Sequence, residues 1–99
     1  MGEEELDDYE ATLELALVQE YKAVVATFDY AIETDRRFYL ANTVEVEVKS
    51  QGSPTLIELV LHDAWVWDMY RAQRFVPLVR VLTFRDVNIE RLPKEDLAP

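Results

Sequence analysis

The chain has 99 residues, of which 49% are hydrophobic and 30% charged, a composition that suits one folded domain and excludes a disordered or fibrous chain. Its net charge of -10 comes largely from the first 20 residues, which hold eight acids and no base, so non-specific binding to nucleic-acid phosphates is disfavoured. The lack of cysteine, of a secretory signal and of an apolar run long enough to span a membrane favours a cytoplasmic protein without membrane contact.

The first predicted element is a helix. Apolar residues recur every three or four positions between Leu6 and Val24, which predicts one long amphipathic helix. The acids that crowd its beginning complement the positive end of the helix dipole. We expect the helix to end near Ala26 and a strand to follow, although residues 24–33 can also be interpreted as a continuing helix.

Three further stretches have the pattern of β-strands. From Phe38 to Val48 apolar and polar side chains alternate, which predicts a strand that pairs with the preceding one as a hairpin. Turn residues at 50–54 lead into the run Thr55 to Trp67, whose few polar positions are typical of a central strand. A last clear strand covers Leu78 to Phe84, and residues 86–90 can extend it past a bend.

These elements predict an α+β fold, in which one long N-terminal amphipathic helix packs on a three- to four-stranded antiparallel sheet. We expect a single domain over residues 1–99, with flexible ends at residues 1–5 and 93–99. One helix covers only one sheet face, so apolar residues on the other face must meet a second copy, a partner or solvent. The pattern does not distinguish an open sheet from a barrel.

The strongest functional signal is the stretch from Ala64 to Phe75, which holds both tryptophans. Trp65 and Trp67 are two residues apart, so on a continuing strand they project to the same face. There they either complete the core under the helix or form a flat surface for a base, a sugar or a partner. The candidate binding residues of this stretch are Trp65, Trp67, Tyr70, Arg71, Arg74 and Phe75.

Other arginines flank the predicted strands. If they gather on one face they form a basic patch suited to phosphate, and otherwise they make ordinary ion pairs with nearby acids. The candidate phosphate contacts are Arg36, Arg37, Arg80 and Arg85.

Residues for catalysis or metal binding are sparse. His62 is the only histidine, and two glycines are too few for a phosphate-cradling loop or a dinucleotide fingerprint. Glu45 and Glu47 share one strand face, which favours a solvated surface over an acid–base pair. We therefore expect no enzyme, no metal and no cofactor.

The string Trp-Val-Trp-Asp-Met-Tyr-Arg at residues 65–71, with residues 36–42 and 83–90, resembles a small family of about this length from high-GC Gram-positive bacteria. That family is catalogued as a domain of unknown function. The resemblance implies a cytoplasmic protein whose gene tends to lie near one for a ribonuclease H type enzyme, and it implies no site residues.

Two functions are expected from these observations. The first is a non-catalytic interaction or scaffolding module that self-associates as a homo-oligomer, such as a homodimer, through the open sheet face. A different protein is the alternative partner for this face. The second is an RNA- or nucleotide-binding accessory protein, in which Trp65 and Trp67 stack bases and local arginines hold phosphate. Nucleic acid is the less favoured partner because the chain is acidic.

Overall fold

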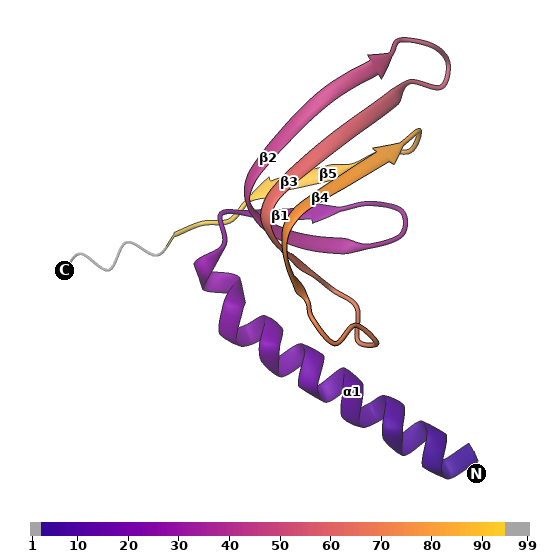
Figure 1. The fold of residues 1–99 in the computed structure, drawn as a ribbon, viewed down its shortest axis with the longest axis vertical. Helices are drawn as coiled ribbons and strands as arrows, with labels where there is room; N and C mark the ends of the chain where they lie inside the picture. Colours follow the sequence, from indigo (N-terminus) through magenta and orange to yellow (C-terminus); the bar gives the residue numbers. More distant parts are fainter. Residues whose placement is uncertain (1–2, 95–99) are drawn as a thin grey trace, which may run out of the picture.

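A computed structural model describes residues 3–94 as one long helix followed by a five-stranded antiparallel sheet (Figure 1). The elements are α1 (Glu3–Val24), a 3₁₀ turn η1 (Val25–Thr27), β1 (Tyr30–Glu33), β2 (Phe38–Ser50), β3 (Leu56–Val66), β4 (Phe75–Thr83) and β5 (Asn88–Arg91). The α+β class is confirmed, and the expected count of three to four strands is wrong. Of the expected flexible ends, residues 1–2 and 95–99 lie outside the described part, whereas residues 3–5 belong to α1.

The segment between the helix and the first strand changes structure within a few residues. α1 ends at Val24, the turn η1 follows, and Phe28 is already extended, with φ -109 and ψ 153. The β-branched residues Val24, Val25 and Thr27 lower the helix propensity here. The expected helix end and following strand are therefore confirmed, and β1 pairs with β2 as a hairpin.

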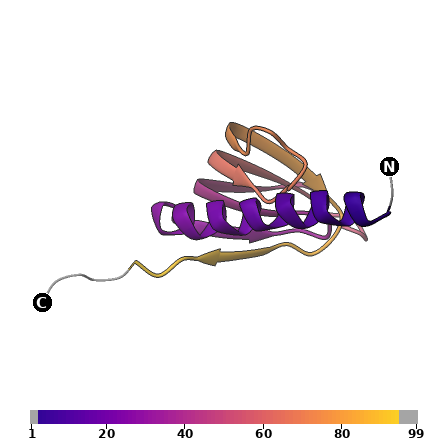
Figure 2. The same ribbon diagram turned by 90° about the horizontal axis from the view of Figure 1, so that it is seen from below.

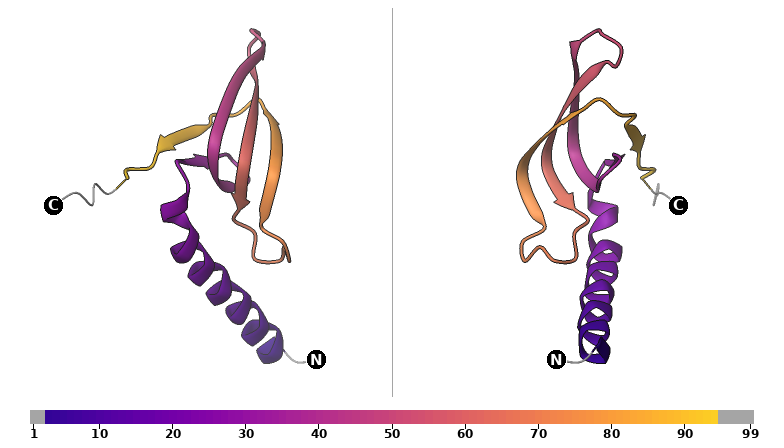
Figure 3. Two further views of the ribbon diagram at one scale, coloured as in Figure 1. Left: turned by 60° about the vertical axis from the view of Figure 1, so that its left-hand side comes forward. Right: turned by 90° about the vertical axis from the view of Figure 1, so that its right-hand side faces the viewer.

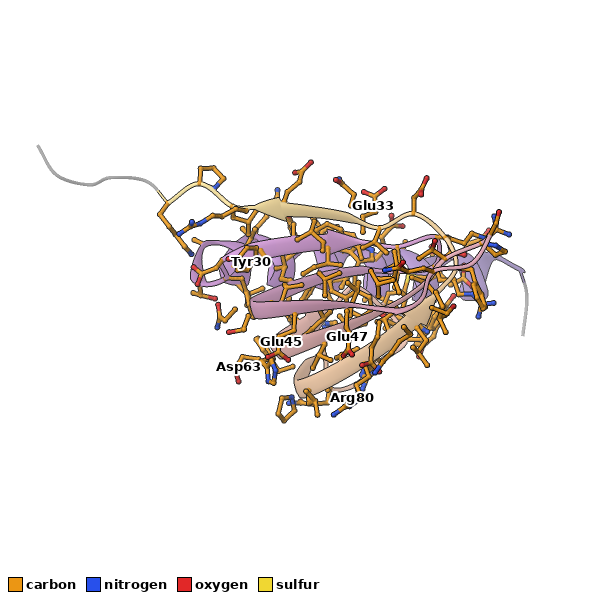
Figure 4. The ribbon with its side chains drawn as sticks, turned by 90° about the horizontal axis from the view of Figure 1, so that it is seen from above. Tyr30, Glu33, Glu45, Glu47, Asp63 and Arg80 are labelled. Carbon is orange, nitrogen blue, oxygen red and sulfur yellow. The ribbon has the colours of Figure 1, made fainter. Side chains whose placement is uncertain are left out.

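The strand order is β4-β3-β2-β1-β5, so the strands at the two edges are neighbours in the chain. Residues 84–87 alone connect β4 to β5, and so short a segment spans at most about 18 Å. The sheet must therefore be strongly coiled, as Figure 2 shows from below. Figure 4 shows Arg80 beside β4 and Glu33 beside β1 and β5, at opposite edges of the coiled sheet. Because β4 pairs with β3 alone and β5 with β1 alone among the described residues, the coil is not a closed barrel.

Residues 86–90 were interpreted as one way to continue the preceding strand past a bend. The strand β5 instead lies on the far side of β1, with Ile89 opposite Ile32. Residues 84–87 turn the chain away from β3, and the apolar side chains of Val87 and Ile89 pack against the inner face of the coil. The strand count was therefore wrong because residues 88–91 form a separate strand at the other edge of the sheet.

Two hydrophobic clusters lie on opposite faces of the sheet. The helix-side cluster consists of the buried residues Leu17, Phe28, Leu40 and Trp65. The inner cluster consists of the buried residues Ile32, Tyr39, Ala41, Leu59, Leu61, Ala64 and Val66. No residue of α1 belongs to the inner cluster, yet Leu59 and Leu61 are fully buried, because the coiled sheet closes over its own face. The face without a helix is thus largely covered by the sheet itself.

Along one row of residues, the alternation of side chains between the two faces of the sheet is interrupted. Ala41 and Val44 both pack in the inner cluster, although a regular strand would point residues three apart to opposite faces. The same step of three occurs on the neighbouring strands, at Leu61 and Ala64 and at Val76 and Val79. The row of the exchange holds Asp63, whose φ of 51 is left-handed and interrupts the regular pleat. The strand expected from Phe38 to Val48 is confirmed, but its alternating side chains do not keep one face.

The helix extends beyond the sheet that it covers (Figures 1 and 3). Leu17 is 2% exposed in the helix-side cluster, whereas Tyr9, two turns earlier, is 60% exposed. The radius of gyration is 16.3 Å, compared with about 13 Å for a compact chain of 100 residues. Within residues 3–94 no helix has the length and apolar character needed to cross a membrane.

Candidate functional site

The two tryptophans lie on the same side of the sheet, as expected, but in different environments. Trp65 is 0% exposed in the helix-side cluster, and its Nε1 donates a hydrogen bond to the Glu20 carboxylate, 2.6 Å away. Trp67 is 36% exposed and lies edge-on to Trp65, with 5.9 Å between the ring centroids. Trp65 is therefore a core residue, and its indole offers no exposed surface on which a base could stack.

Glu20 is the residue that sequence reasoning missed at this site. Its carboxylate accepts two hydrogen bonds from the Arg74 guanidinium, from Nε to Oε1 at 2.8 Å and from Nη2 to Oε2 at 3.0 Å. The hydrogen bond from Arg74 lowers the pKa of Glu20, burial opposes this, and the bond from Trp65 adds to the lowering. The signal was available, because Glu20 follows Leu17 by three residues and so places an acid on the apolar side of the helix.

The remaining residues of the aromatic stretch form the loop between β3 and β4, which lies against α1. The hydroxyl of Tyr70, which is 64% exposed, donates a hydrogen bond to Glu10 at 3.2 Å. Arg71 donates from Nε to the carbonyl of Gln73 at 2.7 Å, and Phe75 begins β4. The six candidate binding residues are thus divided between core and surface and do not form one continuous contact surface.

An apolar depression lies where Trp67 reaches the surface. Tyr21, Phe38 and Trp67 line it, and its volume is about 340 Å³. The rings meet edge to face, with the Tyr21 centroid 5.2 Å from that of Trp67 and the Phe38 centroid 6.1 Å from it. This geometry is favourable for packing between aromatic rings, so the three side chains already stabilise one another through these contacts.

Three of the four candidate phosphate arginines meet at one end of the sheet. Arg36 and Arg37 in the β1–β2 turn and Arg85 after β4 line a pocket of about 530 Å³, which we call the arginine pocket. Arg80 lies outside it, and its nearest acid is Glu58, with 3.9 Å between Nη1 and Oε2. The proposed gathering of arginines is therefore observed for three residues and not for the fourth.

The backbone of the turns holds these arginines in place. The hydroxyl of Thr34 accepts hydrogen bonds from the backbone N–H groups of Arg36 and Arg37, at 3.3 and 3.1 Å. The hydroxyl of Thr83 accepts one from the N–H of Arg85 at 2.9 Å. Such local side-chain bonds favour turns over continued strands, and they fix the positions from which the three guanidinium groups extend.

The three arginines differ in how far they are neutralised. Arg37 forms an ion pair with Asp68 at 3.0 Å, and Arg85 forms a longer one with Asp35 at 3.6 Å. Arg36 has no acidic partner within 4.0 Å among residues 3–94. Among the residues that the structure describes, the arginine pocket therefore keeps one guanidinium group without an acidic partner.

Tyr39 also lines the arginine pocket, from the first residues of β2. The residue is 7% exposed, and no hydrogen bond joins its hydroxyl to another residue in the described part of the chain. Burial raises the pKa of Tyr39, and the charges of Arg37 and Arg71 oppose this in part. The hydroxyl accordingly stays protonated at neutral pH and can donate one hydrogen bond.

β4 is an edge strand with one free side. It pairs with β3 alone, and its side chains Leu78 and Leu82 are 45% and 61% exposed. Arg80 is its only charged residue, and it is the only one of the five strands without an acid. A long edge strand with exposed apolar residues and little charge is a site at which another strand can pair.

The candidate acid–base residues make exposed polar contacts. His62 Nε2 lies 3.4 Å from Glu45 Oε2, and Glu47 Oε2 lies 3.4 Å from Lys49 Nζ. Over residues 3–94, no three histidine, aspartate or glutamate side chains are grouped so that they could hold a metal ion.

Comparison with known proteins places the chain among proteins whose role is not assigned. A family model described as "Protein of unknown function (DUF2469)" matches residues 1–99. An uncharacterized protein of Mycobacterium tuberculosis and one of Mycobacterium bovis are each 54% identical over 97 residues, which cover 98% of this chain and 96% of the relative. No solved structure matches the chain significantly.

Proposed function

We propose that this chain, which belongs to the DUF2469 family, is a non-catalytic interaction module that self-associates through the free edge of β4. The observation that carries the proposal is an edge strand without a single acid, with Leu78 and Leu82 exposed, in a protein of net charge -10. We place this activity in the cytoplasm, where a chain without cysteine needs no disulfide for stability.

Charge favours β4 over the helix as the contact between two copies. The exposed half of α1 carries Asp7, Asp8 and Glu14, so two copies would repel each other there. Every other strand of the sheet also brings at least one acid to a contact. Two β4 strands would approach with only Arg80 charged on each, and the remaining contacts would be apolar.

The geometry of an edge strand suits a symmetric dimer. Two antiparallel copies of β4 related by a two-fold axis would pair their free backbone N–H and C=O groups and extend one sheet across both subunits. With the two-fold axis at Leu78, the two Leu78 side chains would lie beside each other. This arrangement replaces the open sheet face as the contact surface, because the coil of the sheet already buries Leu59 and Leu61.

Sedimentation velocity over a wide range of protein concentration tests this proposal. We expect the native protein to dimerise and Leu78→Glu to be monomeric, because the substitution places two acids beside each other at the two-fold axis. Leu15→Glu is the matched control, since Leu15 is 58% exposed on α1, away from β4. A native protein that stays monomeric, or a dimer that Leu78→Glu and Leu15→Glu affect equally, would contradict the proposal.

A second candidate function, binding of RNA, is favoured by the three arginines of the arginine pocket. With Trp65 buried, stacking would fall to Trp67, which is 36% exposed. Fluorescence titration with single-stranded RNA at low salt tests this candidate, and the affinity should fall steeply as salt is added. Absence of any fluorescence change at low salt would remove it.

A further inference from the structure

We infer that the arginine pocket binds a small molecule in which a phosphate group is joined to an aromatic ring, the chemistry of a nucleoside diphosphate. The pocket combines three guanidinium groups, the hydroxyl of the largely buried Tyr39 and an exposed phenylalanine within one cavity. This inference does not depend on self-association through β4.

The charge of the pocket favours an anion. Arg36, Arg37 and Arg85 line it, and Asp35 is the only acid among its lining residues. The local balance is thus positive in a protein whose net charge is -10. Guanidinium groups bind phosphate oxygens through paired, charge-assisted hydrogen bonds, which makes arginine better suited to this task than lysine.

The existing ion pairs leave room for a phosphate. Arg36 has no acidic partner within 4.0 Å among the described residues, and its guanidinium is available without rearrangement. The pair of Arg85 with Asp35 is long, at 3.6 Å, and the Arg85 side chain is 75% exposed. Exposed pairs of this kind contribute little to stability, so a phosphate can replace the carboxylate at low cost.

The hydroxyl of Tyr39 gives the pocket a directional donor. It belongs to a residue that is 93% buried, and no described residue accepts a hydrogen bond from it. No buried side-chain polar atom among the described residues lacks a partner, so this hydroxyl reaches the surface of the pocket, where a ligand can accept its hydrogen bond. At neutral pH, an ionised phosphate oxygen accepts hydrogen bonds and does not donate them, so it fits this donor.

The size and the apolar lining of the pocket indicate a ligand larger than inorganic phosphate. A volume of about 530 Å³ lies in the usual range of small-molecule sites. Phe84, which is 59% exposed, lines the same cavity with Val81 and Leu82. An aromatic ring can stack on Phe84 while the phosphate reaches the arginines.

The surroundings favour a small ligand over a long nucleic acid. Glu33 and Asp86 lie next in the chain to lining residues, and both are exposed. A strand of RNA needs a continuous basic path along its backbone, whereas here the acids interrupt the basic surface beside the pocket. The basic character is therefore confined to the pocket itself.

Isothermal titration calorimetry with ADP as the probe tests the inference, with pyrophosphate and adenosine as the two partial ligands. We expect ADP to bind more tightly than pyrophosphate, because the ring adds the stacking contact, and adenosine to bind least. The double variant Arg36→Gln/Arg85→Gln should weaken ADP binding about tenfold or more. Tyr39→Phe, which removes only the hydroxyl, should weaken it about threefold to tenfold.

Arg80→Gln is the matched control, since Arg80 is an exposed arginine of β4 outside the pocket. Its ADP affinity should equal that of the native protein. Leu78→Glu should also keep native ADP affinity, so the experiment tests the anion site separately from the proposed dimer. Lack of saturable ADP binding, adenosine binding as tight as ADP, or an affinity that the double variant leaves unchanged would each overturn the inference.

Discussion

Two regions of this protein place arginine beside a buried aromatic side chain, and they differ in whether the chain supplies an acid. On the helix side, Arg74 is held by both oxygens of Glu20, and the same carboxylate accepts the hydrogen bond of Trp65. In the arginine pocket, Arg36 has no acidic partner within 4.0 Å among the described residues, and the hydroxyl of Tyr39 donates to none of them.

The difference teaches how similar residues serve stability in one place and binding in another. Where a carboxylate is supplied from within the chain, the arginine joins two elements, here α1 and the loop before β4. At Arg36, where no described residue supplies one, the positive charge remains available to a ligand. Substitutions on the helix side should therefore change the free energy of unfolding, and substitutions in the pocket should leave it nearly unchanged.

The largest effect is expected for Trp65→Ala. The indole is fully buried, so its removal leaves a cavity in the helix-side cluster and removes the hydrogen bond that Glu20 accepts from it. We expect a loss of about 3–5 kcal/mol in the free energy of unfolding, measured by urea denaturation. Trp67→Ala is the control and should cost clearly less, because Trp67 is 36% exposed. Equal losses for the two variants would contradict the assignment of Trp65 to the core.

A smaller effect is expected for Glu20→Gln, which removes the charge that Arg74 and Trp65 share. Hydrogen bonds to charged groups contribute about 1.5–3 kcal/mol each, and the lower end applies here because the Glu20 side chain is 31% exposed. Urea denaturation at neutral pH measures the loss. Arg37→Gln, which breaks the more exposed pair with Asp68, is the control and should cost less. No loss in Glu20→Gln would contradict the role given to this carboxylate.

The Glu20 pair should also make stability depend on pH. Because the folded pKa of Glu20 is lowered, its contribution is fully present above the unfolded pKa of about 4.3 and is lost as the pH falls through the folded value. The difference in unfolding free energy between the native protein and Glu20→Gln should therefore shrink below pH of about 4. A difference that stays constant from neutral to acidic pH would show that the carboxylate charge contributes nothing.

The smallest effect on stability is expected for Tyr39→Phe. The substitution removes a hydroxyl that bonds to no described residue and leaves the ring packed in the inner cluster. The free energy of unfolding should change by no more than about 0.5 kcal/mol, by the same urea assay. A loss well above about 1 kcal/mol would mean that the hydroxyl already has a partner within the protein, and the contrast between the two regions would fail.

The sequence allowed the helix, the hairpin and the shared side of the two tryptophans to be predicted, because each follows from local spacing. The role of Glu20 was not predicted, since its partners Trp65 and Arg74 are 45 and 54 residues away in the chain. The exchange of faces was hidden for a related reason. It depends on one left-handed residue, Asp63, whose sequence neighbours continue a regular pattern.

The arginine pocket was also hidden in the sequence, because its residues come from separate segments of the chain. Six of the seven arginines were candidate binding residues from the sequence, but only the fold showed which of them meet. The β1–β2 turn brings Arg36 and Arg37 to the end of β4 near Arg85, while Arg80 lies on β4 outside the pocket. Pairing in space between a turn and a distant strand end is not encoded in the spacing of either segment.

The position of β5 has a consequence for how the protein is made. β1 is formed early in the chain and can pair at once with β2, but its other edge is covered only by residues 88–91. Ile32 and its partner Ile89 are 57 positions apart, and pairings of such long range are slow to form. During synthesis, one edge of β1 therefore remains uncovered until residues 88–91 have been made and have folded back onto it, so a long-range pairing completes the sheet.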